Sequence, residues 1–357
     1  MTETVASPQT RAGAPPWVLG HRPSLDSVRG LAVLSVLFGH FDVPGFAAGG
    51  TVGVALFFAL SGYLITSRLL GESMARGRID LQAFYMRRAR RLLPGLAILL
   101  TVLASWAVAT GQFGAWLPGG LAVTFYVANW AWILHVPLIG LAHAWSLAIE
   151  EQFYFLWPIA LQMMQRRGHN IVLPLTLAAI ALSYALTFAH LDNYLLAFAG
   201  SDARAKDLLV GCAIALISVR RGRDLQIPTA AAAAAAGLLV VVASGRFVAI
   251  NALITAVPCA ILVAWFAARP NFARWRPITF TGRISYGLYL YHYPMAFGPL
   301  GVFDGMDTWP RAVALFAATY ALASLSWFVV ERRFIRRSVV VATGAAVRPE
   351  LQPAVPS

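Results

Sequence analysis

Long apolar runs, separated by short polar segments, fill most of the chain between residues 28 and 330. About 20 consecutive apolar residues are enough to cross the hydrocarbon core of a bilayer. Because that core offers no water to backbone polar groups, spanning segments must be helices or closed barrels, and runs of this length exclude a barrel. The pattern predicts an all-α, polytopic membrane bundle. We expect about ten transmembrane helices, over residues 28–46, 51–70, 92–110, 145–165, 171–190, 206–219, 228–244, 248–268, 283–301 and 311–330.

Residues 113–142 do not fit this count easily, because they are apolar enough to form an eleventh crossing. An eleventh crossing would invert every later loop and place the arginine-rich segments "RRGHN" and "RRGRD" outside. We therefore interpret residues 113–142 as a re-entrant or interfacial segment on the outer face, anchored by Trp116, Trp130 and Trp132. The eleventh crossing is the alternative.

The loops give the orientation, since cytoplasmic loops carry an excess of Lys and Arg. In the ten-helix scheme every inner loop is rich in arginine, from "RGRIDLQAFYMRRARR" to "ERRFIRR". This asymmetry predicts that both termini are cytoplasmic. The outer connections are expected to hold few cations, namely Arg204, Lys206, Arg246 and Arg311, beside the acids Asp42, Asp192, Asp202, Asp207, Asp304 and Asp307.

The composition agrees with a membrane protein. The chain has 357 residues, of which 59% are hydrophobic and 12% charged, and its mean hydropathy is +0.67. A soluble domain carries about a quarter charged residues. The net charge of +13 raises the question of whether the protein binds nucleic acid. The arginines, however, sit in short loops, where they set the orientation of the helices in the membrane and bind anionic headgroups. We expect the bilayer as a partner, and no nucleic acid.

The two ends and the cysteines carry little chemistry. Residues 1–23 lack the apolar core of a cleavable signal, and residues 338–357 are similarly rich in Ala, Pro and polar residues, so both are expected to be disordered tails without an appended soluble domain. Cys212 and Cys259 lie in apolar segments, and no Cys/His cluster has metal-ligand spacing. We expect no metal.

Ionisable residues inside membrane spans are functional candidates by default. Arg29 and His40, in the first span, are 11 residues apart, which is about three helical turns, so they share a face at a distance of roughly 16 Å. They therefore cannot touch on a straight helix. The alternatives are a snorkelling Arg29 paired with Asp26, and a core histidine bonded to a neighbouring helix.

A basic cluster precedes the third span in "FYMRRARRLLP". Arginine binds phosphate groups bidentately, so this cluster suits a pyrophosphate or a phosphorylated ribose. Anionic lipid, or the charge bias of inner loops, explains it as well. The four arginines are Arg87, Arg88, Arg90 and Arg91.

The segment "HAWSLAIEEQFYFLWP" places two glutamates in the next span. His143, Glu150 and Tyr154 recur at helical spacing, with Ser146 or Leu147 between them, and form one polar stripe. Glu151 points about 100° away from this stripe. Such a stripe must face the bundle interior or a wet cavity.

The last polar cluster is "RISYGLYLYHYP", in which Tyr286, Tyr289 and Tyr293 share one face while Ser285 and His292 share another. An aromatic belt with one satisfied histidine is the alternative. Taken together, the clusters predict one shared cavity with a phosphate-binding mouth and an acid/base centre deeper in. The chain contains no G-x-S-x-G elbow, H-E-x-x-H metal motif or Walker sequence.

These segments resemble, in the same order and at similar spacing, the motifs of the membrane-bound acyltransferase 3 family. The matching stretches are "LDSVRGLAVLSVLFGH", "GVALFFALSGYLIT", "FYMRRARRLLP", "HAWSLAIEEQFYFLWP" and "ISYGLYLYHYP". The resemblance assigns residues 24–337 to one acyltransferase 3 transmembrane domain. Ser27 replaces a common glycine, and Ala55 stands where an acid is frequent.

The resemblance implies a multi-pass O-acyltransferase in the plasma membrane of a bacterium. Its co-substrate would be acetyl-CoA or another short acyl-CoA, and its acceptor a hydroxyl of a carbohydrate-containing molecule, such as a surface polysaccharide, a lipid-linked sugar or a glycosylated metabolite. Longer members carry an esterase-like domain, so a second transfer step here would need a separate partner. The family's arginine and histidine correspond to Arg29 and His40, and its paired arginines to Arg88 and Arg91.

We therefore expect the acyl-CoA phosphates to bind the four clustered arginines, together with Arg29. His40 would act as general base or as a transient acyl carrier, and Glu150 or Glu151 would orient an imidazole. A transporter or flippase also buries charges around a central path, but no convincing internal repeat supports that alternative. The weaker candidates, on the acceptor side, are His143, Tyr154, Tyr289 and His292.

Overall fold

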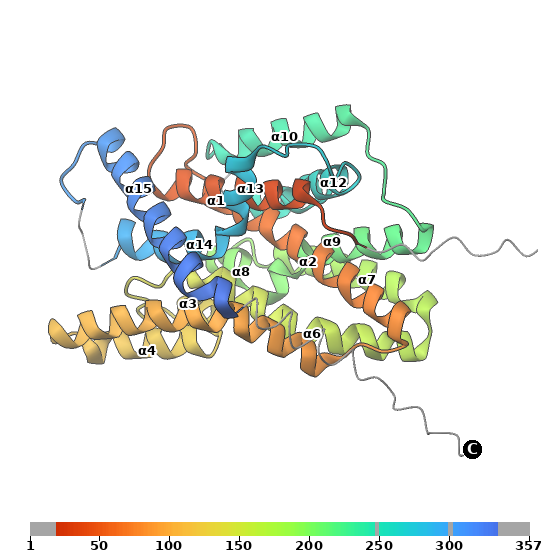
Figure 1. Cartoon of the computed structure of the whole chain (residues 1–357), viewed down its shortest axis with the longest axis horizontal. Helices are drawn as coiled ribbons and strands as arrows, with labels where there is room; N and C mark the ends of the chain where they lie inside the picture. The colour runs from red at the N-terminus through yellow and green to blue at the C-terminus, as the bar shows by residue number, and fades with distance from the viewer. Residues whose placement is uncertain (1–18, 247–249, 299–302, 335–357) are drawn as a thin grey trace, which may run out of the picture.

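The computed structural model describes residues 19–246, 250–298 and 303–334. Within these ranges the chain is helical and has no β-strand, which confirms the all-α prediction. Figure 1 shows the helices packed into one bundle. Most of the two predicted tails, at residues 1–18 and 335–357, lies outside the described residues.

Seven helices of 18 residues or more build the bundle. They are α1 (Pro23–His40), α2 (Gly49–Arg76), α3 (Leu81–Ala109), α6 (Ala144–Arg167), α7 (His169–Ala189), α9 (Ser201–Arg221) and α15 (Thr308–Ser326), which continues into the π-helical turn η1 (Trp327–Glu331). The shorter helices are α4 (Phe113–Thr124), α5 (Ala128–Ile133), α8 (Tyr194–Ala199), α10 (Thr229–Ala243), α11 (Asn251–Ile254), α12 (Ala256–Ala267), α13 (Arg276–Arg283) and α14 (Ser285–Ala296).

Four helical segments in the described chain are long and apolar enough to cross a membrane: Gly49–Arg76, Leu81–Ala109, His169–Ala189 and Thr308–Phe334. Helices α1, α6 and α9 also have 18, 24 and 21 residues, but each carries charged side chains. These charges need partners inside the bundle, because hydrocarbon does not solvate them. The full set of about ten spans and the cytoplasmic termini stay predictions.

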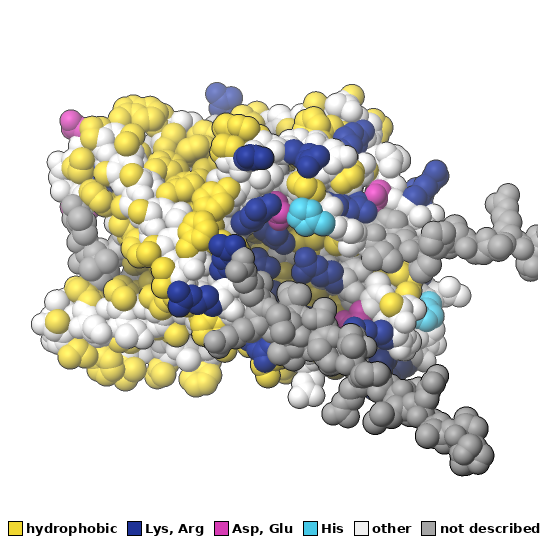
Figure 2. All heavy atoms as spheres, in the orientation of Figure 1, with side chains coloured by type: hydrophobic (Ala, Val, Ile, Leu, Met, Phe, Trp, Pro, Cys, Tyr) yellow, Lys and Arg dark blue, Asp and Glu magenta, His cyan; other side chains and the backbone are white. Residues whose placement is uncertain are grey.

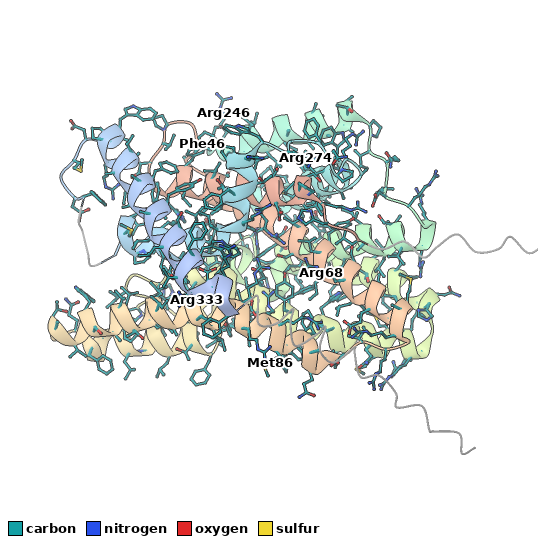
Figure 3. All side chains as sticks on the ribbon, in the orientation of Figure 1. Phe46, Arg68, Met86, Arg246, Arg274 and Arg333 are labelled. Carbon is teal, nitrogen blue, oxygen red and sulfur yellow. The ribbon has the colours of Figure 1, made fainter. Side chains whose placement is uncertain are left out.

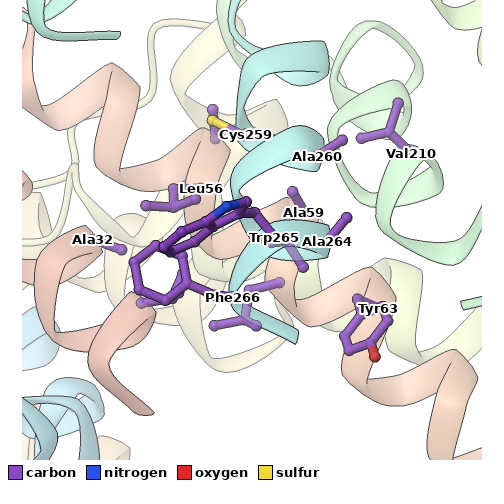
Figure 4. Packing of buried hydrophobic residues seen from close by; sticks show 14 of the residues in the cluster. Ala32, Leu56, Ala59, Tyr63, Val210, Cys259, Ala260, Ala264, Trp265 and Phe266 are labelled. Carbon is purple, nitrogen blue, oxygen red and sulfur yellow. The ribbon is translucent and has the colours of Figure 1, made fainter. Parts of the chain in front are cut away.

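The core forms where α2 packs against α1, α9 and α12. Small residues let the backbones of α2 and α9 approach closely, and a Cβ on Gly62 of α2 would lie 1.9 Å from the backbone oxygen of Leu208. Figure 4 shows Trp265 and Phe266 of α12 packed beside Leu56 of α2, in the same buried cluster. Close packing of small residues is the usual source of helix association in membranes.

Helices α3 and α4 run side by side along one edge of the bundle (Figure 1). The 12 residues of α4 cover only about 18 Å at 1.5 Å per residue, which is short of the hydrocarbon thickness. Helix α5 is shorter still, with 6 residues. Gln152 of α6 fixes the turn between α4 and α5, because its amide nitrogen donates to the Tyr126 carbonyl at 2.8 Å and to Asn129 Oδ1 at 2.9 Å. Residues 113–142 therefore contain no single helix long enough to span the membrane, and their place on the outer face stays a prediction. Trp116, expected as an interfacial anchor, is instead buried in the core.

The structure corrects the expectation for Arg204, Lys206 and Asp207, which were assigned to an outer connection. All three lie within α9 and are fully buried. The physical reason is local pairing, since Arg204 Nε lies 3.0 Å from Asp207 Oδ2 across one helical turn, and Lys206 Nζ donates to the Ala203 carbonyl at 2.6 Å. Paired charges of this kind tolerate burial far better than isolated ones.

Two predicted spans are interrupted. The described part of 248–268 is divided between α11 and α12, which meet at Thr255, and that of 283–301 begins with the junction of α13 and α14 at Ile284. Residues 248–249 and 299–301 of these predicted spans lie outside the described residues. Helix α14 begins directly after the break at Ile284, with Ser285. The polar residues of α14 face α1, α3 and α6.

The contact between α2 and α9 generates a stability prediction. Gly62→Ala should destabilise the protein by about 1–3 kcal/mol or more, because the added methyl collides with the backbone of α9. Gly71→Ala, in the same helix but with no atom within 4 Å of the added Cβ, should be neutral or slightly stabilising. Thermal unfolding of the purified protein in one detergent measures both. Equal melting temperatures for the two variants would contradict the close approach.

Candidate active site

A cavity opens between five helices of the bundle. Its walls come from segments far apart in the sequence, namely α1, α2, α3, α6 and α14. Each of the five predicted polar clusters contributes to this lining, but His40, His143 and His292 do not line the cavity, so the prediction of one shared cavity with the acid/base centre in it is met only in part. The polar lining residues are Arg29, Ser61, Arg88, Arg91, Ser146, Glu150, Tyr154, Ser285, Tyr286 and Tyr289.

An ion pair between α3 and α6 forms one wall of this cavity. The Arg88 guanidinium donates to both oxygens of Glu151, with Nε at 2.8 Å from Oε2 and the terminal nitrogen bonded to Oε1. The guanidinium carbon lies 3.2 Å from the centre of the Tyr154 ring. This fork geometry and ring contact are available to arginine but not to lysine.

The two glutamates have different roles in the structure. Glu150 lines the cavity and accepts a hydrogen bond from the Ser61 hydroxyl at 2.6 Å, whereas Glu151 turns toward Arg88. The stripe through Glu150 and Tyr154 thus faces the cavity, as the spacing predicts. The expectation that either carboxylate orients an imidazole is not met, because their partners here are Ser61 and Arg88.

The four clustered arginines do not act as one group. Arg88 and Arg91 line the cavity on one face of α3, while Arg87 is exposed and has Glu72 at 3.6 Å. Arg90 is not among the lining residues. The spacing explains the split, because positions three apart share a helix face and their neighbours do not.

Two further arginines lie close to this face. Arg29 lines the cavity and also donates to Asp26 at 3.0 Å, so the pairing that was considered as an alternative is present. Arg68, an exposed residue of α2 labelled in Figure 3, lies within electrostatic range of Arg91. Figure 2 shows Lys and Arg side chains gathered at the centre of one face of the molecule. Arg68 was not among the predicted site residues, although it lies near the end of the second predicted span, residues 51–70.

A second group of polar side chains, the imidazole cluster, consists of His40, His143 and His292. His40 Nδ1 lies 2.7 Å from His292 Nε2, and the two rings are nearly coplanar with an angle of 6°. His143 contacts His292 edge to face, with ring centres 5.3 Å apart. The structure thus unites three histidines that lie more than 100 residues apart in the sequence.

His143 is 3% exposed, and its ring stacks on that of Tyr293 with centres 5.0 Å apart.

Tyr289 lies between the cavity and the imidazole cluster. Its hydroxyl lines the cavity, donates to the His143 carbonyl at 2.9 Å and is bonded to the Ser146 hydroxyl. Its ring contacts those of His143 and His292, with centres 5.6 and 5.4 Å away. The tyrosine therefore forms the wall between the two polar regions.

A second, more apolar cavity lies on the other side of the Arg88–Glu151 pair. It is bounded by α3, by α6 and by the turn after α4, where Phe125 and Phe155 are largely exposed. The Tyr85 hydroxyl donates to the Phe155 carbonyl at 2.7 Å and links the two long helices there. Because α4 is short, the space between α3 and α6 is not covered along its full length.

No cluster of His, Cys, Asp and Glu suited to a metal occurs in the described residues.

The chain matches the model of the acyltransferase domain family over residues 22–328, and it belongs to that family. Peptidoglycan O-acetyltransferase OatA of Listeria monocytogenes is 32% identical over 346 residues, which cover 87% of this chain and 55% of that protein. O-acetyltransferase OatA of Staphylococcus aureus is 31% identical over 305 residues, which cover 76% of this chain and 50% of that protein. The chain spans about half the length of these curated relatives. No solved structure matches it.

The Arg88–Glu151 pair yields a second prediction. Arg88→Leu leaves a buried carboxylate without its counter-charge, and it should destabilise the protein by about 3–5 kcal/mol. The double variant Arg88→Leu/Glu151→Leu should recover much of this loss, because no unpaired charge remains. Thermal unfolding of the two single variants and the double variant gives the coupling free energy.

Arg246→Leu is the control for loss of an arginine, since Arg246 is exposed and lies away from the cavity (Figure 3). Additive effects of the two single substitutions would show that the pair does not contribute as a unit.

Proposed function

We propose that the chain is an integral-membrane O-acyltransferase that moves an acetyl or other short acyl group from acyl-CoA to a hydroxyl of a carbohydrate-containing acceptor. The observation that carries this proposal is the arginine-lined cavity that ends at Tyr289, with paired histidines directly behind it. Family membership and relatives named as O-acetyltransferases support the reaction class. The name of the Listeria relative makes peptidoglycan the first acceptor to test.

The arginines supply the donor site in this proposal. Arg29, Arg88 and Arg91 converge on one cavity from two helices, and Arg68 adds positive charge nearby. Guanidinium groups bind phosphate with paired hydrogen bonds, so they suit the pyrophosphate and ribose phosphate of CoA. The flexible arm of CoA would then extend along α1 toward His40, which is roughly 16 Å from Arg29 along the helix axis.

His40 is the proposed reactive imidazole. As a general base it takes the proton of the acceptor hydroxyl while the hydroxyl oxygen bonds to the acyl carbon. The C–S bond then breaks, and the imidazolium returns the proton to the departing thiolate to give the CoA thiol. As an acyl carrier, a ring nitrogen of His40 bonds to the acyl carbon while the C–S bond breaks, and the thiolate leaves and is protonated to the CoA thiol. The acceptor hydroxyl oxygen then bonds to the acyl carbon, the N–C bond breaks, and the released imidazole takes up the hydroxyl proton.

Tyr289 separates donor and imidazole in the closed arrangement, so its side chain must move for the acyl group to pass. Its hydroxyl is held by Ser146 and by the His143 carbonyl. The acceptor would approach His40 from the end of α1 that lies away from the arginines, where His40 is half-buried rather than enclosed. In this proposal the protein acts at the bacterial plasma membrane.

The role of His40 is tested by His40→Ala in membranes supplied with labelled acetyl-CoA. Removal of the general base or acyl carrier should lower transfer to the acceptor by at least ~10²-fold. Binding of acetyl-CoA should persist, because the arginine cavity is unaltered. The readouts are label incorporated into the glycan fraction and acetyl-CoA binding to the purified variant. Unchanged transfer would show that His40 is not the reactive group.

The donor site is tested separately with Arg91→Gln. This variant keeps a polar side chain of similar length but loses the charge, so acetyl-CoA binding should weaken by about tenfold or more, as expected for a charge-assisted hydrogen bond. Arg246→Gln is the matched control, since Arg246 is an exposed arginine that does not line the cavity. Isothermal titration of the purified proteins measures both. Equal affinities would place the CoA phosphates elsewhere.

A further inference from the structure

The geometry points to His292 as the positioning residue that fixes the tautomer of His40, so that Nε2 of His40 is the reacting nitrogen. This inference deepens the proposed function and rests on it, because it concerns the same imidazole. It derives from two hydrogen bonds in series, from a backbone carbonyl through His292 to His40. Sequence and family resemblance assign His292 no such role.

The series begins at a backbone acceptor. His292 Nδ1 lies 2.7 Å from the carbonyl oxygen of Tyr289. A carbonyl oxygen can only accept, so Nδ1 of His292 must carry the proton. In a neutral imidazole the other nitrogen is then an acceptor. His292 is 0% exposed, and its ring contacts are with other aromatic rings and imidazoles, so the neutral form fits its surroundings.

The second bond transmits this choice to His40. At 2.7 Å, the contact between His292 Nε2 and His40 Nδ1 requires one N–H and one lone pair. Because His292 Nε2 supplies the lone pair, His40 Nδ1 supplies the proton. The lone pair of neutral His40 is therefore on Nε2. Both routes proposed above, general base and acyl carrier, need an unprotonated nitrogen, and the series leaves only this one.

The surroundings of Nε2 agree with a reacting atom. A Cβ added to Gly50, in the first turn of α2, would lie 3.3 Å from His40 Nε2. The absence of a side chain at this position leaves space beside Nε2 for a ligand atom. His40 Nδ1, in contrast, is occupied by His292.

Tyr289 anchors the series at its other end. Its backbone carbonyl accepts the hydrogen bond from His292, while its hydroxyl closes the arginine cavity. A single residue of α14 thus contacts both halves of the site. Helix α14 holds His292 and Tyr289 one turn apart, which is the spacing needed for the ring of one to reach the carbonyl of the other.

The first experiment reads the tautomer directly. The chain contains seven histidines, so a ¹⁵N-histidine-labelled sample in lipid nanodiscs gives few signals, and His40→Ala and His292→Gln assign two of them. We expect a scalar coupling across an N–H···N hydrogen bond, with the proton on Nδ1 of His40 and an unprotonated Nε2. A proton on Nε2 of His40, with Nδ1 as the acceptor, would overturn the inference.

The second experiment uses a pair of substitutions. His292→Leu removes the acceptor and should lower acyl transfer roughly 10²-fold, the contribution of a correctly protonated base. The affinity for acetyl-CoA should stay unchanged. His292→Gln places an amide oxygen near the former Nε2 and should retain a larger share of the activity. His190→Leu is the control, because His190 pairs with Asp202 outside the cluster.

The pattern of results separates the two levels of the proposal. Wild-type transfer by His292→Leu, or equal losses in the Leu and Gln variants with an unchanged fold, would contradict the positioning role. Failure of the wild-type protein to bind acetyl-CoA would contradict the proposed function alone, since the NMR measurement still decides the tautomer.

Gly50→Ala, compared with Gly71→Ala, tests the space beside Nε2, and only the former should slow transfer.

Discussion

Charge cannot remain unpaired in a low-dielectric interior, and the Arg88–Glu151 pair is where this constraint shapes the protein most. The pair links α3 to α6, and it is covered on one side by the ring of Tyr154. Since neither charge is stable alone, each helix needs the other in place. Further hydrogen bonds tie the same two helices to their neighbours. Glu150 of α6 is bonded to Ser61 of α2, and Tyr286 is bonded to the Leu92 carbonyl of α3.

The polar interior is divided into two chemically different regions that meet at Tyr289. One is lined by arginines and suits anionic groups, and the other is the imidazole cluster of His40, His143 and His292. Separation has a physical advantage, because a cluster of guanidinium groups beside a histidine would disfavour any imidazolium formed during the reaction. Distance along α1 achieves this separation, while one continuous helix still fixes the relative positions of Arg29 and His40.

Sequence patterns predicted the features that depend on local spacing. The apolar helices follow from the hydrophobic runs, and the Glu150 stripe follows from helical periodicity. The pair Arg88 and Arg91 came from the family resemblance, whereas the sequence pattern alone grouped all four arginines. Features that depend on contacts across the bundle could not be predicted from the sequence. The His40–His292 bond joins residues 252 positions apart, and nothing in either segment specifies the other. The burial of Arg204 was also missed, because loop counting treats a charged residue as exposed and cannot see its partner in the next turn.

The buried charges of α9 have a consequence for how the protein is made. Arg204, Lys206 and Asp207 fall within four residues near the start of α9, and charged side chains disfavour insertion of an isolated helix into a bilayer. On its own, this segment is a poor substrate for the insertion machinery. Its stable partner is α2, which is synthesised more than a hundred residues earlier and meets α9 at Gly62 and Gly211. Biogenesis of the bundle is therefore expected to require that α2 stays accessible at the translocon until α9 emerges.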